Sequence, residues 1–133
     1  MPTEPDKATR GNAANGCRLL VVDDDEDNLA LLTALLRHEG YLISAARNGA
    51  SALELLQEGL DPDLILTDLM MPVMSGWDFC ETLKGSPSYR SIPIVVTCGM
   101  ATEPRGKLQV EAAFEKPIDV KALLRKLQEL CGL

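Results

Sequence analysis

The chain has 133 residues, of which 46% are hydrophobic and 25% charged, and this length and composition are typical of one globular domain. The 20 Asp and Glu residues outnumber the 13 Lys and Arg residues, so the formal net charge is -7. This charge disfavours direct binding to nucleic acid or to an anionic membrane, because phosphate contacts need a basic face. Protein partners or a cation are therefore expected.

The sequence contains no sign of export or of a membrane anchor. No apolar run approaches the roughly 18 residues of a membrane span, and the amino terminus lacks a signal-peptide core. The cysteines are widely spaced, without the Cys-x-x-Cys pattern of metal or redox sites; they are Cys17, Cys80, Cys98 and Cys131. We therefore predict free thiols and a cytoplasmic protein.

Residues 1–16 show no apolar periodicity and consist of small, polar and charged residues with proline. Such a segment buries too little apolar surface to fold, so a disordered tail is predicted there. The domain is expected to occupy residues 17–133.

Within the domain, short apolar runs alternate with segments in which leucine recurs at helical spacing. Strands are predicted at residues 18–22, 41–46, 64–67, 92–96 and 112–114. Helices are predicted at residues 28–39, 50–58, 76–84 and 120–130. Between residues 99 and 111 the pattern is weak, because Gly99, Pro104 and Gly106 interrupt it, so a helix there is expected to be short or shifted.

This alternation of strands and helices predicts the fold class. Strands rich in Leu, Ile and Val favour a parallel sheet that is covered on both faces. Right-handed crossover connections leave few topologies for such a sheet. We therefore predict a doubly wound α/β domain with five parallel strands.

Chemically reactive side chains follow the ends of four predicted strands. Asp23 and Asp24 follow the first strand, Asp68 the third, Thr97 the fourth and Lys116 the fifth. Because the carboxyl ends of parallel strands share one edge of a sheet, these side chains are expected to converge in a crevice at that edge.

Three carboxylates in one crevice repel each other unless a positive charge lies between them. A hard divalent cation with oxygen ligands, Mg²⁺ or Mn²⁺, would provide it. The predicted metal ligands are Asp23, Asp24, Asp68 and the backbone carbonyl of Met70.

A carboxylate beside such a cation can act as a nucleophile toward a phosphoryl group. Asp68 is the predicted phosphoacceptor. Thr97 would then hydrogen-bond one phosphoryl oxygen, and Lys116 would pair with another.

The chain resembles the receiver domain of two-component response regulators over about 117 residues. Four pieces carry the resemblance, in the family's order: LLVVDDD, LILTDLMMPVMSGWDF, IPIVVT and EKPI. The resemblance implies a flavodoxin-like (βα)5 fold with strand order 2-1-3-4-5. It further implies that the acid pair binds Mg²⁺ and that the third-strand aspartate takes a phosphoryl group. The residues carried over are Asp23, Asp24, Asp68, Met70, Thr97 and Lys116.

The resemblance also implies partners. The phosphoryl donor would be a sensor histidine kinase or a histidine phosphotransfer protein, and the output would be contact with a downstream protein or with a second copy of the chain. The chain would act as a switch rather than as a turnover enzyme. It could be a complete single-domain regulator, a phosphorelay intermediate or part of a hybrid kinase.

One departure from the family concerns signal output. The family's switch aromatic lies three residues before the lysine, where this chain has Ala113, and Phe114 should point to the opposite face of the strand. We hypothesise that phosphorylation instead orders the segment from residue 99 to residue 110.

Three other interpretations of these residues differ from a receiver domain. A calcium loop fails, because the glycine and the final glutamate of that motif are replaced by Asn28 and Ala34. A haloacid dehalogenase-type phosphohydrolase requires a different residue at Asp27 and a longer chain. A protein-binding module that works without phosphorylation remains the main alternative.

Overall fold

The computed structural model describes residues 16–71, 73–99 and 110–132, and their strands form one parallel sheet in the order β2-β1-β3-β4-β5. The strands are β1 (Arg18–Val22), β2 (Leu42–Ala46), β3 (Leu64–Asp68), β4 (Ile94–Cys98) and β5 (Ala112–Glu115). Four helices accompany them in these ranges: α2 (Glu26–His38), α3 (Gly49–Gln57), α4 (Gly76–Lys84) and α5 (Val120–Leu130). The predicted fold class and the strand order implied by the resemblance are confirmed.

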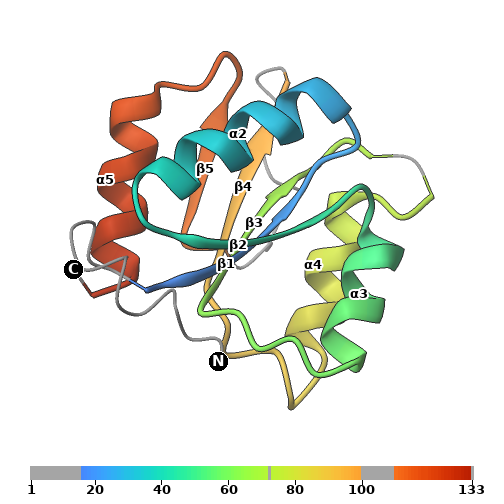
Figure 1. Ribbon diagram of the computed structural model, residues 1–133. Coiled ribbons are helices and arrows are strands. Elements are labelled where there is room, and N and C mark those ends of the chain that lie inside the picture. The colour runs from blue at the N-terminus through green and yellow to red at the C-terminus, as the bar shows by residue number, and fades with distance from the viewer. Residues whose placement is uncertain (1–15, 72, 100–109, 133) are drawn as a thin grey trace.

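Helices cover both faces of the sheet (Figure 1). Helices α2 and α5 lie on one face, and α3 and α4 lie side by side on the other. Alternate residues of β1 enter the two cores, with Leu19 and Val21 under α2 and α5 and with Leu20 and Val22 under α3 and α4. The central strands are therefore buried on both sides, which explains their continuous apolar sequence.

Several element boundaries differ from the prediction by one or two residues, and two of these differences bear on the site. Helix α2 begins at Glu26, two residues early, because the side chain of Asp25 caps it by accepting hydrogen bonds from the backbone N–H groups of Asp27 and Asn28. Strand β4 runs from Ile94 to Cys98, so Thr97 lies within the strand rather than after it.

Two predictions fall outside the described residues. These are the disordered tail, of which residues 1–15 are not described, and the irregular segment, of which residues 100–109 are not described. Within the described ranges, every helix is too short or too polar to cross a bilayer.

The prediction of free thiols is wrong for one pair of cysteines. Cys17, directly before β1, forms a disulfide with Cys131, which caps the carboxyl end of α5. The sheet order brings these positions together, with a Cα–Cα distance of 6.1 Å, although they are 114 residues apart in the sequence. Cys80 and Cys98 are buried thiols that form no disulfide, so the prediction holds for this second pair.

This disulfide should stabilise the domain strongly, because it closes a loop that spans nearly the whole chain. In the chain-entropy account, a crosslink over about 100 residues removes enough unfolded-state entropy to stabilise a fold by about 2–5 kcal/mol. We therefore expect reductant to lower the free energy of unfolding by that amount, measured by urea unfolding. The double variant Cys17→Ser, Cys131→Ser serves as the control, and reductant should not change its stability. Alkylation of all four cysteines in the unreduced, denatured protein would contradict the bond.

Candidate functional site

The acidic run after β1 divides into residues with different tasks. Asp23 is buried, and its Oδ1 atom accepts a hydrogen bond of 3.0 Å from the backbone N–H of Asp25. Asp25 caps α2, and the exposed Glu26 and Asp27 lie in its first turn, where negative charge is favourable. Only Asp23 and the exposed Asp24 remain available to the site.

The end of β3 places Asp68 next to Asp23. Residues Val22 and Thr67 are partners in the register of β1 and β3, so the residues that follow them lie at the same edge of the sheet. Asp68 is 4% exposed, and its Oδ1 atom accepts a hydrogen bond of 3.2 Å from the backbone N–H of Met70. Two buried carboxylates therefore share one crevice.

The start of α4 fixes the chain after Asp68. The backbone N–H of Gly76 donates to the carbonyl of Leu69 at 2.9 Å, so the helix begins directly against the strand end. A Cβ atom at Gly76 would collide with the carbonyl oxygen of Asp68 and would lie 2.5 Å from Leu69 Cα. Glycine is required there because the two backbones approach closely.

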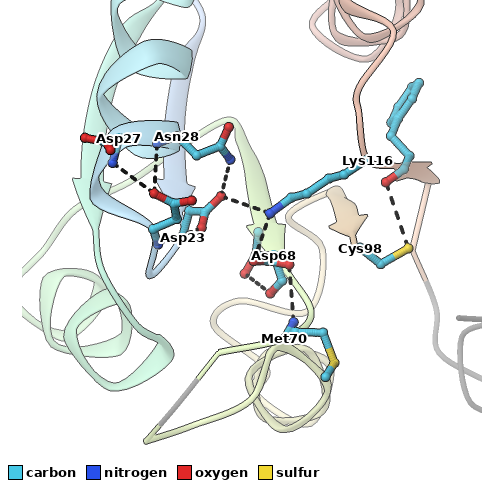
Figure 2. Close-up of polar contacts among 10 residues, drawn as sticks. Asp23, Asp27, Asn28, Asp68, Met70, Cys98 and Lys116 are labelled. Atoms are coloured by element: carbon cyan, nitrogen blue, oxygen red, sulfur yellow. Dashed lines mark hydrogen bonds and ion pairs between the residues drawn. The ribbon is translucent and has the colours of Figure 1, made fainter. Parts of the chain in front are cut away.

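Lys116 brings a positive charge to both carboxylates. Its backbone N–H donates to the carbonyl of Cys98 at 2.7 Å, which holds it at the end of β5. From there the side chain reaches across β4 toward the acids, as Figure 2 shows. Its Nζ atom lies 3.2 Å from Asp68 Oδ2 and 3.6 Å from Asp23 Oδ2.

The acids also fit a divalent cation. One carboxylate oxygen each from Asp23, Asp24 and Asp68 lie within 4.8 Å of one another. Among the described residues, the ammonium of Lys116 is the one cation in contact with these three carboxylates, which leaves two negative charges uncompensated within that part of the chain when all are ionised. Clustered oxygens with excess negative charge are the donor set that Mg²⁺ and Mn²⁺ prefer.

Burial and neighbouring charges shift the pKa values of Asp68 and Lys116. Burial raises the pKa of Asp68 above that of an ordinary aspartate, and it outweighs the hydrogen bond from Met70 and the charge of Lys116, which both lower that pKa. Burial alone would lower the pKa of Lys116, but Asp23 and Asp68 together raise it above that of an ordinary lysine. Lys116 is therefore positively charged at neutral pH.

The other residues considered in the sequence analysis lie on or near this edge of the sheet. Thr97 is buried and is the register partner of Asp68, which puts it at the same edge of the sheet. Met70 is 61% exposed. Ala113 is exposed, whereas Phe114 is half-buried and packs on the α2 and α5 side, so the predicted opposite orientation of these two neighbours is confirmed.

One residue in the cluster was not predicted from the sequence. The side-chain amide of Asn28 donates a hydrogen bond to Asp23 Oδ2 (Figure 2). Its position in the first turn of α2, five residues after Asp23, places it beside the strand end. The five-residue spacing between Asp23 and Asn28 indicates this contact only when the helix is known to start at Glu26.

The sequence matches the model of the response regulator receiver domain family over residues 19–128. The chain belongs to this family. The strand order, the acid cluster at the strand ends and the lysine that follows β5 agree with the match.

Similar proteins support the assignment. The chain is 41% identical to response regulator PleD of Caulobacter vibrioides over 119 residues, covering 85% of this chain but 26% of PleD. It is 32% identical to the polar-differentiation response regulator DivK of Brucella anthropi, covering 86% of this chain and 95% of DivK. Thus the chain spans about a quarter of one relative and nearly all of the other.

A solved structure with the same fold is the receiver domain of sensor histidine kinase PA1611 from Pseudomonas aeruginosa. It superposes with a TM-score of 0.77 at 26% identity, covering 90% of this chain and all of that one. In that structure a magnesium ion is coordinated in the active-site cleft.

The close approach at Gly76 yields a first prediction for the site. Gly76→Ala should destabilise the domain by about 1–3 kcal/mol, because the new methyl group must displace the backbone of Asp68 or Leu69. Chemical unfolding measures the change. Gly85→Ala is the matched control, because the nearest atom to a Cβ there is the Glu81 carbonyl oxygen at 3.4 Å. Equal stability of the two variants would contradict the proposed clash.

The charge balance yields a second prediction, made for the metal-free protein. Lys116→Met should raise the pKa of Asp68 further, because it removes an ammonium that favours the carboxylate. Carboxyl-carbon NMR titration measures this pKa, and Lys121→Met, at an exposed position of α5, is the control. An unchanged Asp68 pKa in Lys116→Met would show that the ion pair is not formed.

The same shifts predict how stability depends on pH. Because the folded-state pKa of Asp68 is raised, its contribution to stability should fall as pH rises through that value. The contribution of Lys116 should hold below the pKa of an unfolded lysine and be lost as pH rises through its raised folded-state pKa.

Proposed function

We propose that the chain is a phosphoacceptor switch that takes a phosphoryl group from a phosphohistidine onto Asp68. The observation that carries the proposal is the placement of Lys116 Nζ between two buried carboxylates, beside a third acid, at the carboxyl edge of the sheet. A nucleophile, a fixed positive charge and a set of metal ligands are thus close together.

The transfer itself asks little of the protein beyond positioning. A lone pair of one Asp68 oxygen forms the new P–O bond while the P–N bond of the donor breaks. The electron pair of that bond returns to the imidazole, which takes up a proton. Asp68 Oδ1 is held by the backbone N–H of Met70 and Oδ2 by Lys116, so the carboxylate is oriented before the donor arrives.

Asp23, Asp24, Asp68 and the Met70 carbonyl would hold Mg²⁺ or Mn²⁺, which when bound supplies positive charge against the phosphoryl oxygens. Lys116 would shift from the carboxylate to a phosphoryl oxygen, since the lysine is the cation that already contacts Asp68. Thr97 would hydrogen-bond another phosphoryl oxygen from the neighbouring strand.

The phosphodonor would be a sensor histidine kinase or a histidine phosphotransfer protein, and the output would be contact with a downstream protein. A cytoplasmic location is part of this proposal. The division into a tail at residues 1–16 and a receiver at residues 17–133 also stays a prediction, since the family match begins at residue 19.

One observation favours the alternative, a protein-binding module that works without phosphorylation. The switch position carries the exposed methyl group of Ala113, and the aromatic ring of Phe114 packs on the opposite face under α5. Phe114 therefore lies on the other side of β5 from the position of the family's switch aromatic. In this alternative, affinity for a partner would be equal with and without the phosphoryl group.

Intact mass spectrometry after incubation with Mg²⁺ and a small acyl phosphate tests the proposal. We expect one phosphoryl adduct on the wild-type chain, and none for Asp68→Ala or when the metal is chelated. Asp63→Ala is a matched control, because Asp63 lies at the opposite end of β3, and this variant should still be modified. Absence of an adduct on the wild type would favour the binding module.

A further inference from the structure

Asp23 is held on both of its oxygens although its carboxylate is buried. Oδ1 accepts the backbone N–H of Asp25, and Oδ2 accepts the side-chain amide of Asn28. Lys116 Nζ approaches the same Oδ2 at 3.6 Å, farther than its 3.2 Å contact with Asp68. The amide of Asn28 and the ammonium of Lys116 therefore share one oxygen.

We propose that Asn28 is a positioning residue that orients Asp23 for the cation and leaves Lys116 free to pair with Asp68. The inference rests on the proposed function, because it assigns Asn28 a part in the same site. Without the amide, Asp23 Oδ2 would need another donor, since a buried carboxylate oxygen is costly without one. Lys116 Nζ already lies 3.6 Å from that oxygen and could become this donor.

The local structure holds Asn28 firmly enough for this task. Its backbone N–H donates to the side chain of Asp25, the cap of α2, so its place in the first helical turn is fixed. The same cap residue donates its own backbone N–H to Asp23 Oδ1. Asp23 and Asn28 are thus oriented by one short turn, and the amide reaches the carboxylate from a rigid element.

The chemistry of the amide suits this position. An amide donates a hydrogen bond without bringing a charge, whereas lysine or arginine would add a second cation that competes with a metal ion. An aspartate would add a fourth carboxylate and could not donate when ionised. Asparagine can therefore orient the ligand while leaving the charge of the cluster unchanged.

Calorimetric titration of Mg²⁺ into the wild type and into Asn28→Ala tests the consequence. We expect about tenfold weaker binding in the variant, the size typical of losing a residue that orients a metal ligand. Gln57→Ala is the matched control, because it truncates an exposed amide at the end of α3 and should bind Mg²⁺ like the wild type. Equal affinity of Asn28→Ala and the wild type would overturn the inference.

Phosphorylation kinetics separate positioning from a general structural role. In Asn28→Ala, the Mg²⁺ concentration that gives half the maximal rate should rise about tenfold, matching the change in affinity. The melting temperature should stay close to that of Gln57→Ala. A lower melting temperature with an unchanged Mg²⁺ dependence would mean that Asn28 only stabilises the fold.

The hydrogen bond from Asn28 to Asp23 can be tested without metal. This test applies even if the wild type neither binds Mg²⁺ nor accepts a phosphoryl group. The side-chain amide protons of Asn28 should be shifted in the NMR spectrum of the metal-free wild type and should return to ordinary values in Asp23→Ala. An unshifted amide in the wild type overturns the inference. Failure of the wild type to bind Mg²⁺ would instead count against the proposed function.

Discussion

The ion contacts of Lys116 with Asp23 and Asp68 are the interaction on which the site depends. A buried carboxylate is unstable as an anion without a counter-charge, and here two lie within reach of one ammonium. The three residues come from the ends of β1, β3 and β5, so the contact exists only if the sheet has its observed order. The charge arrangement of the site therefore depends on the strand order of the fold.

The ion contacts of Lys116 leave the site with excess negative charge. Burial keeps the pKa of Asp68 raised despite the positive charge of Lys116. Asp24 adds a third carboxylate, and the described part of the chain brings no second cation to the cluster. Such a site gains more from a bound cation than a balanced ion pair would, and that cation would then offset the negative charge of an incoming phosphoryl group. The same imbalance that costs stability in the metal-free protein thus favours binding.

Much of this arrangement could be predicted from the sequence, because parallel strands bring their carboxyl ends to one edge. The convergence of Asp23, Asp68 and Lys116 followed from that rule alone. The disulfide did not, since the proximity of Cys17 and Cys131 depends on how α5 packs against the amino end of β1. The spacing of the cysteines in the sequence does not indicate that Cys17 and Cys131 lie close together.

Asn28 was missed for a different reason. Its contact depends on where α2 begins, and the helix start was predicted two residues late, which moved Asn28 to the edge of the helix. Because Asp25 caps the helix, α2 starts at Glu26, and Asn28 lies in its first turn with its side-chain amide against Asp23. Side-chain capping, rather than apolar periodicity, therefore decided the detail of the site.

Locating the phosphoryl group on the chain tests the role of Asp68 directly. Borohydride reduces an acyl phosphate of aspartate to homoserine, so the phosphorylated protein can be reduced, digested and sequenced by mass spectrometry. We expect homoserine at position 68 alone, and only after treatment with the phosphodonor. Homoserine at another aspartate, or at none while an adduct is present, would contradict the role of Asp68.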